Sequence, residues 1–145
     1  MQCSQLNLSE SLIESFSIKN GKLSIFHNYC VLEIDEGTIV NFENSKDLLK
    51  HINHYYKDGR PFGIISNRTD SYSIDLSETH KFRTNKIQPV AKAVVTYNET
   101  SKRFIALENH FCKIKRQGFP SLEKAEEWIL NEVEVAKKQI IAIKS

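Results

Sequence analysis

The chain has 145 residues, of which 40% are hydrophobic and 26% are charged. These values are ordinary for one soluble domain, so we expect a single domain over residues 1–145 that folds without disulfides or metals. The formal net charge of +2 at pH 7 does not call for a polyanion, and we expect no nucleic-acid partner. Since no apolar run reaches the length of a bilayer, we also expect no membrane span.

The first residues are weakly patterned, which predicts a loose arm over residues 1–14. They carry neither the basic nor the apolar region of a signal peptide. The three cysteines, Cys3, Cys30 and Cys112, are widely spaced and odd in number, as is usual in a reducing compartment. We therefore expect a cytoplasmic protein with three unreactive thiols.

The first regular elements are short strands. The segment FSIKNGKLSIF predicts a hairpin, because apolar residues alternate on both sides of Asn20-Gly21, a pair that favours a type I′ turn. YCVLEI (residues 29–34) predicts a further strand, and residues 38–42 a short one.

Helices and apolar strands alternate in the rest of the chain. Residues 44–59 have helical apolar spacing and end at a Gly-x-Pro sequence. The runs PFGIIS (61–66) and AKAVVTY (91–97) are typical of strands covered on both faces. Further predicted elements are a short helix within residues 76–90, a helix from residue 101, an outer strand at residues 113–119 and a long helix from residue 121.

The long helix has a clear division between apolar and charged positions. Its inner face is predicted to comprise Leu122, Ala125, Ile129, Val133, Ala136 and Ile140. Its outward residues are predicted to include Glu126, Glu127, Glu132 and Glu134, with Trp128 beside the inner face. The alternation of strands and helices along the chain predicts an α/β fold.

Five strings over residues 23–130 carry a resemblance when taken together. They are EIDEG (33–37), PFGIISNR (61–68), SYS (71–73), AVVTYN (93–98) and SLEKAEEWI (121–129). This succession resembles a group of small bacterial proteins, typical of Bacteroidetes, assigned to the STAS/SpoIIAA-like superfamily. The resemblance implies a mixed β-sheet of about five strands with helices packed mainly on one face. It implies no particular activity.

The better-known STAS proteins are anti-sigma-factor antagonists with a switch serine, preceded by Asp, at the start of a helix after a core strand. The corresponding strand here is residues 62–66, and Asp70-Ser71 follows it. The continuation Tyr72-Ser73 departs from the small residues usual there. Phosphorylation at Ser71 or Ser73 is therefore a hypothesis that the resemblance raises.

Polar side chains follow the predicted buried strand at residues 62–66. In open α/β sheets, ligands and partners bind beyond the carboxyl ends of the strands. Arg68 could hold a phosphate or carboxylate through two parallel hydrogen bonds. Alternatively, Asn67 and Asp70 cap turns while Arg68 pairs with a nearby carboxylate. The predicted binding residues are Ser66, Asn67, Arg68, Asp70, Ser71, Tyr72 and Ser73.

Patterns typical of catalysis or metal binding are weak. Asp47, His51 and His54 share one helix face, but no Cys or His signature accompanies them, so a solvated face is the preferred interpretation. The chain contains no GxGxxG, no GxxxxGK[ST] and no GxSxG sequence. We expect no catalytic residue, no metal and no cofactor.

The functional expectation is a non-enzymatic module that binds a protein partner, including a second copy of itself, with the Ser71/Ser73 loop tuning the contact. The alternative is a small anionic-ligand or lipid-binding protein that uses the Arg68 region. Residues 76–120 carry nine Lys and Arg against three Asp and Glu, which suits either a solvated face or a phosphate-bearing or acidic partner.

Overall fold

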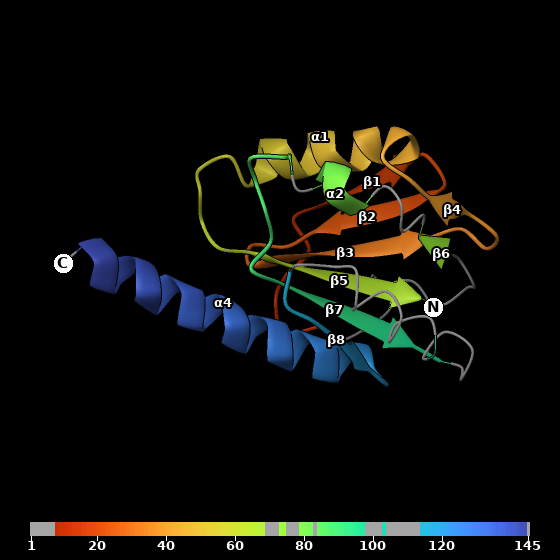
Figure 1. Ribbon diagram of the computed structural model, residues 1–145. Coiled ribbons are helices and arrows are strands. Elements are labelled where there is room, and N and C mark those ends of the chain that lie inside the picture. Colours follow the sequence, from red (N-terminus) through yellow and green to blue (C-terminus); the bar gives the residue numbers. More distant parts are fainter. Residues whose placement is uncertain are drawn as a thin grey trace.

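The computed structural model describes residues 8–68, 73–74, 79–82, 84–97, 103 and 114–144. Within these residues, six strands form one mixed sheet in the order β1-β2-β3-β5-β7-β8, while β4 and β6 form a separate parallel pair (Figure 1). The strands are β1 (Glu14–Ile18), β2 (Gly21–Ile25), β3 (Tyr29–Ile34), β4 (Ile39–Val40), β5 (Gly63–Arg68), β6 (Ser73–Ile74), β7 (Ala91–Thr96) and β8 (Arg116–Phe119). The predicted mixed α/β fold is confirmed.

Within the main sheet, β2 alone runs opposite to the other five strands. β1, β2 and β3 are antiparallel, and β3, β5, β7 and β8 are parallel. The helices are α1 (Lys46–Tyr55), preceded by the 3-10 turn η2 (Glu43–Ser45), the short α2 (Thr79–Phe82) and the long α4 (Leu122–Lys144). No helix within the described residues is both long enough and apolar enough to cross a membrane.

The predicted hairpin forms, but its turn differs from the expected type. Ile18 pairs with Gly21, so Lys19 and Asn20 make the loop, and Asn20 is the residue with positive φ (64°). A Cβ on Gly21 would lie 2.2 Å from the carbonyl oxygen of Glu33 on β3. Glycine is thus required at position 21 because a neighbouring strand approaches closely. The residue with the left-handed conformation is Asn20, and asparagine tolerates that conformation.

Side chains of the central strands alternate between two separate apolar clusters. On β5, Ile65 belongs to the cluster that contains α4, whereas Ile64 packs against the cluster that contains α1. Because successive residues of a strand point to opposite faces, α4 and α1 cover opposite faces of the sheet. This arrangement differs from the expected one, with helices mainly on one face, and explains why the strands are apolar on both sides.

The α4 face holds the larger cluster. Its β-strand residues include Tyr29, Val31, Ile65, Ala93 and Val95, and α4 contributes the buried residues Leu122, Ala125, Ile129 and Val133. The small residues Gly63, Ala91 and Ala93 let the helix approach the sheet, and a Cβ on Gly63 would lie 2.6 Å from Ile129. The first four predicted inner-face positions are confirmed, while Ala136 and Ile140 are only partly buried.

The α1 face is built from aromatic stacking. Tyr56 and Phe62 stack with ring centroids 4.0 Å apart, and the Tyr56 hydroxyl donates to the carbonyl oxygen of Phe26 at 2.8 Å. Arg60 lies over the same tyrosine ring, 4.7 Å from its centroid. Burial raises the pKa of the Tyr56 hydroxyl well above its ordinary value. These contacts fix the end of α1 against the start of β5.

The described part of the expected N-terminal arm, residues 8–14, is anchored. Ser9 N–H donates to both carboxylate oxygens of Glu126, at 3.1 and 2.9 Å, and Leu8 packs against the α4-face cluster. Glu10 accepts hydrogen bonds from the backbone and side chain of Asn28. These contacts join individual residues that are distant in the sequence, so they leave no periodic pattern in it.

Other predicted elements agree with the structure where it describes them. The short helix α2 lies within residues 76–90, and β8 is an edge strand of the sheet. Gly59 adopts a φ of +81° after α1, as expected for a helix terminator. Most of the helix predicted from residue 101 lies outside the described residues.

Candidate functional site

The carboxyl ends of three parallel strands meet at one edge of the sheet. The arrowheads of β3, β5 and β7 point to the same side, next to the small β4–β6 pair (Figure 1). Asn67 pairs with Val95, and Arg68 pairs with Thr96, so the last residues of β5 and β7 lie side by side. We call this region the strand-end edge and define it by Ser66, Asn67, Arg68, Thr96 and Tyr97.

The two polar residues at the end of β5 face opposite sides of the sheet. Asn67 is buried and its side-chain oxygen accepts a hydrogen bond of 2.9 Å from the Tyr97 hydroxyl. Ser66 is 1% exposed, and its hydroxyl has no hydrogen-bond partner. An unsatisfied buried hydroxyl is unfavourable, so a ligand atom that forms a hydrogen bond with Ser66 would remove this cost.

Tyr97 is the exposed aromatic residue of this edge. Its side chain remains 52% exposed although its hydroxyl is held by the buried Asn67. Partial burial, followed by repulsion from Glu123 and Glu33, raises the pKa of the Tyr97 hydroxyl above its ordinary value. The hydroxyl therefore stays protonated at neutral pH and keeps donating to Asn67.

The remaining predicted site residues are only partly described. The backbone of Arg68 ends β5, and Ser73 begins β6, where it pairs in parallel with Ile39 of β4. This pairing brings the backbone of Ser73 beside the segment that follows β3. Asp70, Ser71 and Tyr72 lie outside the described residues, as do the side chains of Arg68 and Ser73.

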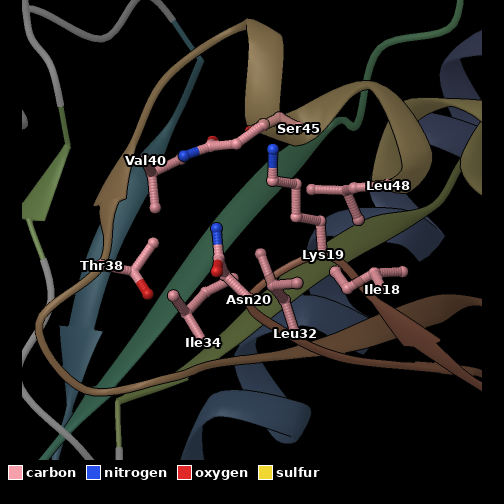
Figure 2. A pocket seen from close by; sticks show the side chains of 10 residues that line it. Ile18, Lys19, Asn20, Leu32, Ile34, Thr38, Val40, Ser45 and Leu48 are labelled. Atoms are coloured by element: carbon pink, nitrogen blue, oxygen red, sulfur yellow. The ribbon is translucent and has the colours of Figure 1, made fainter.

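A small hollow lies on the α1 face, near the carboxyl end of β3 (Figure 2). Its volume is about 20 Å³, enough for one water-sized group. Apolar side chains from β1, β3, β4 and α1 form most of its wall, and polar groups lie among them. The lining residues are Ile18, Lys19, Asn20, Leu32, Ile34, Thr38, Val40, Asn44, Ser45 and Leu48.

The helix face with Asp47, His51 and His54 does not assemble a metal site. The His51 ring stacks on Phe16 at 3.9 Å, and the His54 ring meets Tyr55 edge-on at 5.2 Å. No group of three or more His, Cys, Asp and Glu side chains suited to a metal occurs among the described residues. The imidazoles serve as packing surfaces on this face.

The described cysteine is also a packing residue. Cys30 is fully buried on β3, and burial raises the pKa of its thiol from 9.0 to about 12. A thiol with such a pKa carries almost no thiolate at neutral pH and is a poor nucleophile. The prediction of an unreactive thiol agrees with this environment for Cys30, while Cys3 and Cys112 lie outside the described residues.

Two features were absent from the predicted site. The sequence predicts Tyr97 at the end of a strand without a role, because its hydrogen bond to Asn67 depends on the register between β5 and β7. The hollow beside Lys19 and Ser45 depends on how a turn, two strands and a helix meet, and no local pattern in the sequence indicates it.

The fold and the strand-end edge define a mixed α/β protein with a polar site at the end of parallel strands. No family model, no curated protein and no solved structure matches the chain. The comparisons thus assign neither a family nor an activity.

Proposed function

We propose that the chain is a non-enzymatic, STAS-like regulatory module that binds a protein partner through the strand-end edge. The observation that carries the proposal is the half-exposed Tyr97 ring, held in place by its hydrogen bond to the buried Asn67. An aromatic side chain that is rigid before binding loses little conformational entropy on contact, and such residues dominate protein interfaces.

The surrounding arrangement supports a contact that can be tuned. Ser73 begins β6, which pairs with β4, and β4 follows β3 in the chain. Residues 69–72 therefore connect the end of β5 to this small sheet. Phosphorylation at Ser71 or Ser73 would add close to two negative charges to the stretch of chain between β5 and the end of β6. A change of charge at that position alters both the on-rate and the selectivity of a partner.

The test compares affinity purifications from the native host with wild-type protein, Tyr97→Ser and the control Val135→Ser. Val135 is a comparably exposed apolar residue on α4, outside the strand-end edge. We expect a partner that is retained by wild type and by the control but lost by Tyr97→Ser. Titration of the purified pair by calorimetry should then show weaker binding for the Ser71→Asp/Ser73→Asp double variant. If no protein distinguishes Tyr97→Ser from Val135→Ser, the proposal is wrong.

A second candidate function is binding of a small anionic ligand or lipid in the Arg68 region. The buried Ser66 hydroxyl without a partner favours it, because a ligand oxygen would satisfy that group. The measurement is a thermal-shift screen with anionic metabolites and lipids on wild type, Arg68→Ala and Ser66→Ala. A shift that is lost in both variants supports this function, and a panel without any shift opposes it.

A further inference from the structure

The hollow beside the β1–β2 turn combines an apolar wall with a set of hydrogen-bonding groups. Its polar lining comprises the Lys19 ammonium, the Asn20 and Asn44 amides and the hydroxyls of Thr38 and Ser45. Asn44 is already engaged, since its amide donates to Ile39 and its oxygen accepts from Asn41. Lys19, Asn20, Thr38 and Ser45 are the lining side chains with groups available to a ligand.

Ser45 is the most informative of these residues. It is 4% exposed, it occupies the N-cap position of α1, and its hydroxyl makes no capping hydrogen bond. Serine at this position ordinarily accepts a hydrogen bond from the first turn of the helix. Here the residue lines the hollow instead, so its hydroxyl is available to a group that enters there.

Lys19 lies across the same hollow. Figure 2 shows its amine directed toward Ser45, and Lys19 forms no ion pair with any described residue. The turn that carries it is held in place, because Asp35 N–H donates to the carbonyl oxygen of Asn20 at 2.8 Å. Both the lysine ammonium and the N-terminal turn of a helix are electropositive, so a hollow lined by Lys19 and Ser45 favours an anion.

The wall and the size of the hollow select the kind of anion. Inorganic phosphate bound here would press some of its oxygens against the apolar side chains of Leu32, Ile34 and Val40, which is unfavourable. A carboxylate instead carries a carbon substituent that can contact these apolar side chains. A volume of about 20 Å³ admits the end of a ligand but not a whole metabolite. Asp35 and Asp47 lie in the neighbouring turn and helix and reduce the attraction, so the binding is weak.

We propose that this hollow is a subsite for a small carboxylate with a short apolar chain. The methyl end of the chain enters the hollow and contacts Leu32, Ile34 and Val40, and the carboxylate lies at the open side between the Lys19 ammonium and the Ser45 hydroxyl. This site adjoins the strand-end edge, because Leu32 pairs with Ser66, but it shares no lining residue with that edge. The proposal holds whether or not the chain binds a protein through Tyr97.

The experiment is a titration of the ¹⁵N-labelled full chain with propionate, followed by two-dimensional NMR. We expect saturable shifts confined to the backbone amides around Lys19, Thr38 and Ser45, with a dissociation constant on the order of 1 mM. Propionamide, which has the same shape without the charge, should give no saturable shift. Inorganic phosphate should bind at least tenfold more weakly than propionate.

The variants distinguish binding of propionate in this hollow from nonspecific attraction of the anion to exposed lysines. Lys19→Met should weaken propionate binding at least tenfold, Lys19→Arg should retain most of it, and Ser45→Ala should weaken it several-fold. Lys50→Met, which removes an exposed lysine of α1 that does not line the hollow, should leave it unchanged. Thermal midpoints confirm that each variant is folded. Equal binding by Lys19→Met, or phosphate binding as tight as propionate, would overturn the proposal.

Discussion

The Tyr29 hydroxyl donates a 2.5 Å hydrogen bond to the carboxylate of Glu126, and both residues are buried between β3 and α4. Glu126 also accepts the backbone N–H of Ser9, so one carboxylate joins the N-terminal segment, the sheet and the long helix. Hydrogen bonds to a charged acceptor are stronger than neutral ones, and the remote partners cannot be replaced by local contacts. This carboxylate therefore acts as a structural centre of the α4 face.

Replacement of Glu126 by alanine should destabilise the protein by about 2–3 kcal/mol, because the buried Tyr29 hydroxyl loses its acceptor. The matched control is Glu127→Ala, which removes the exposed neighbouring glutamate and should change stability by about 0.5 kcal/mol or less. Urea unfolding of both variants measures the difference. Equal stability of the two variants would show that the buried carboxylate has no special role.

The thiol of Cys30 should be protected from reagents and should make stability depend on alkaline pH. Its pKa is about 12 in the folded chain against 9.0 ordinarily, so the unfolded chain loses the proton first. The free energy of unfolding is thus unaffected by this thiol below pH 9 and falls between pH 9 and pH 12. In a Cys3→Ser/Cys112→Ser background, a disulfide reagent at pH 8 should label Cys30 only as fast as the chain unfolds. Rapid labelling of the folded protein would contradict the burial of this thiol.

Much of the fold could be predicted because its signals are local. β5 and β7 are buried on both faces, so they appear in the sequence as continuous apolar runs. α4 is buried along one face, so its apolar residues recur at helical spacing. The prediction that Glu126 points outward was wrong because it followed from the charge of the side chain and not from its position on the helix. Its position four residues after Leu122 places it toward the sheet, but a glutamate is ordinarily exposed unless it has partners. Those partners, Ser9 and Tyr29, are more than 90 residues away.

The candidate site could likewise be predicted only where its signals are local. A rule about parallel strands located Ser66, Asn67 and Arg68 at the carboxyl end of β5, which the structure agrees with. The role of Tyr97 required the register between β5 and β7, and the hollow required the position of α1 over the β1–β2 turn. Both depend on how distant elements pack, and no window of a few residues contains that information.

Two glycines should respond differently to alanine, for different physical reasons. Gly21→Ala places a methyl group against the backbone of β3, so the strands must separate, at a cost of about 2–3 kcal/mol. Gly37→Ala meets no atom within 4 Å, and its cost of about 1 kcal/mol comes from the positive φ of 77° alone. Thermal or urea unfolding distinguishes the two. A Gly21→Ala variant that is as stable as Gly37→Ala would mean that the β2–β3 contact is looser than described.

The two halves of α4 should also differ in their contribution to stability, although both carry isoleucine. Ile129 is fully buried over Gly63, so Ile129→Ala removes packing and leaves a cavity, with a cost of about 3–4 kcal/mol. Ile143 is 85% exposed, and the same substitution there should change stability by about 0.5 kcal/mol or less. Unfolding measured at two protein concentrations tests both statements. A cost above 1 kcal/mol for Ile143→Ala that grows with concentration would show that this end of the helix is covered by a second copy of the chain, because only association makes stability depend on concentration.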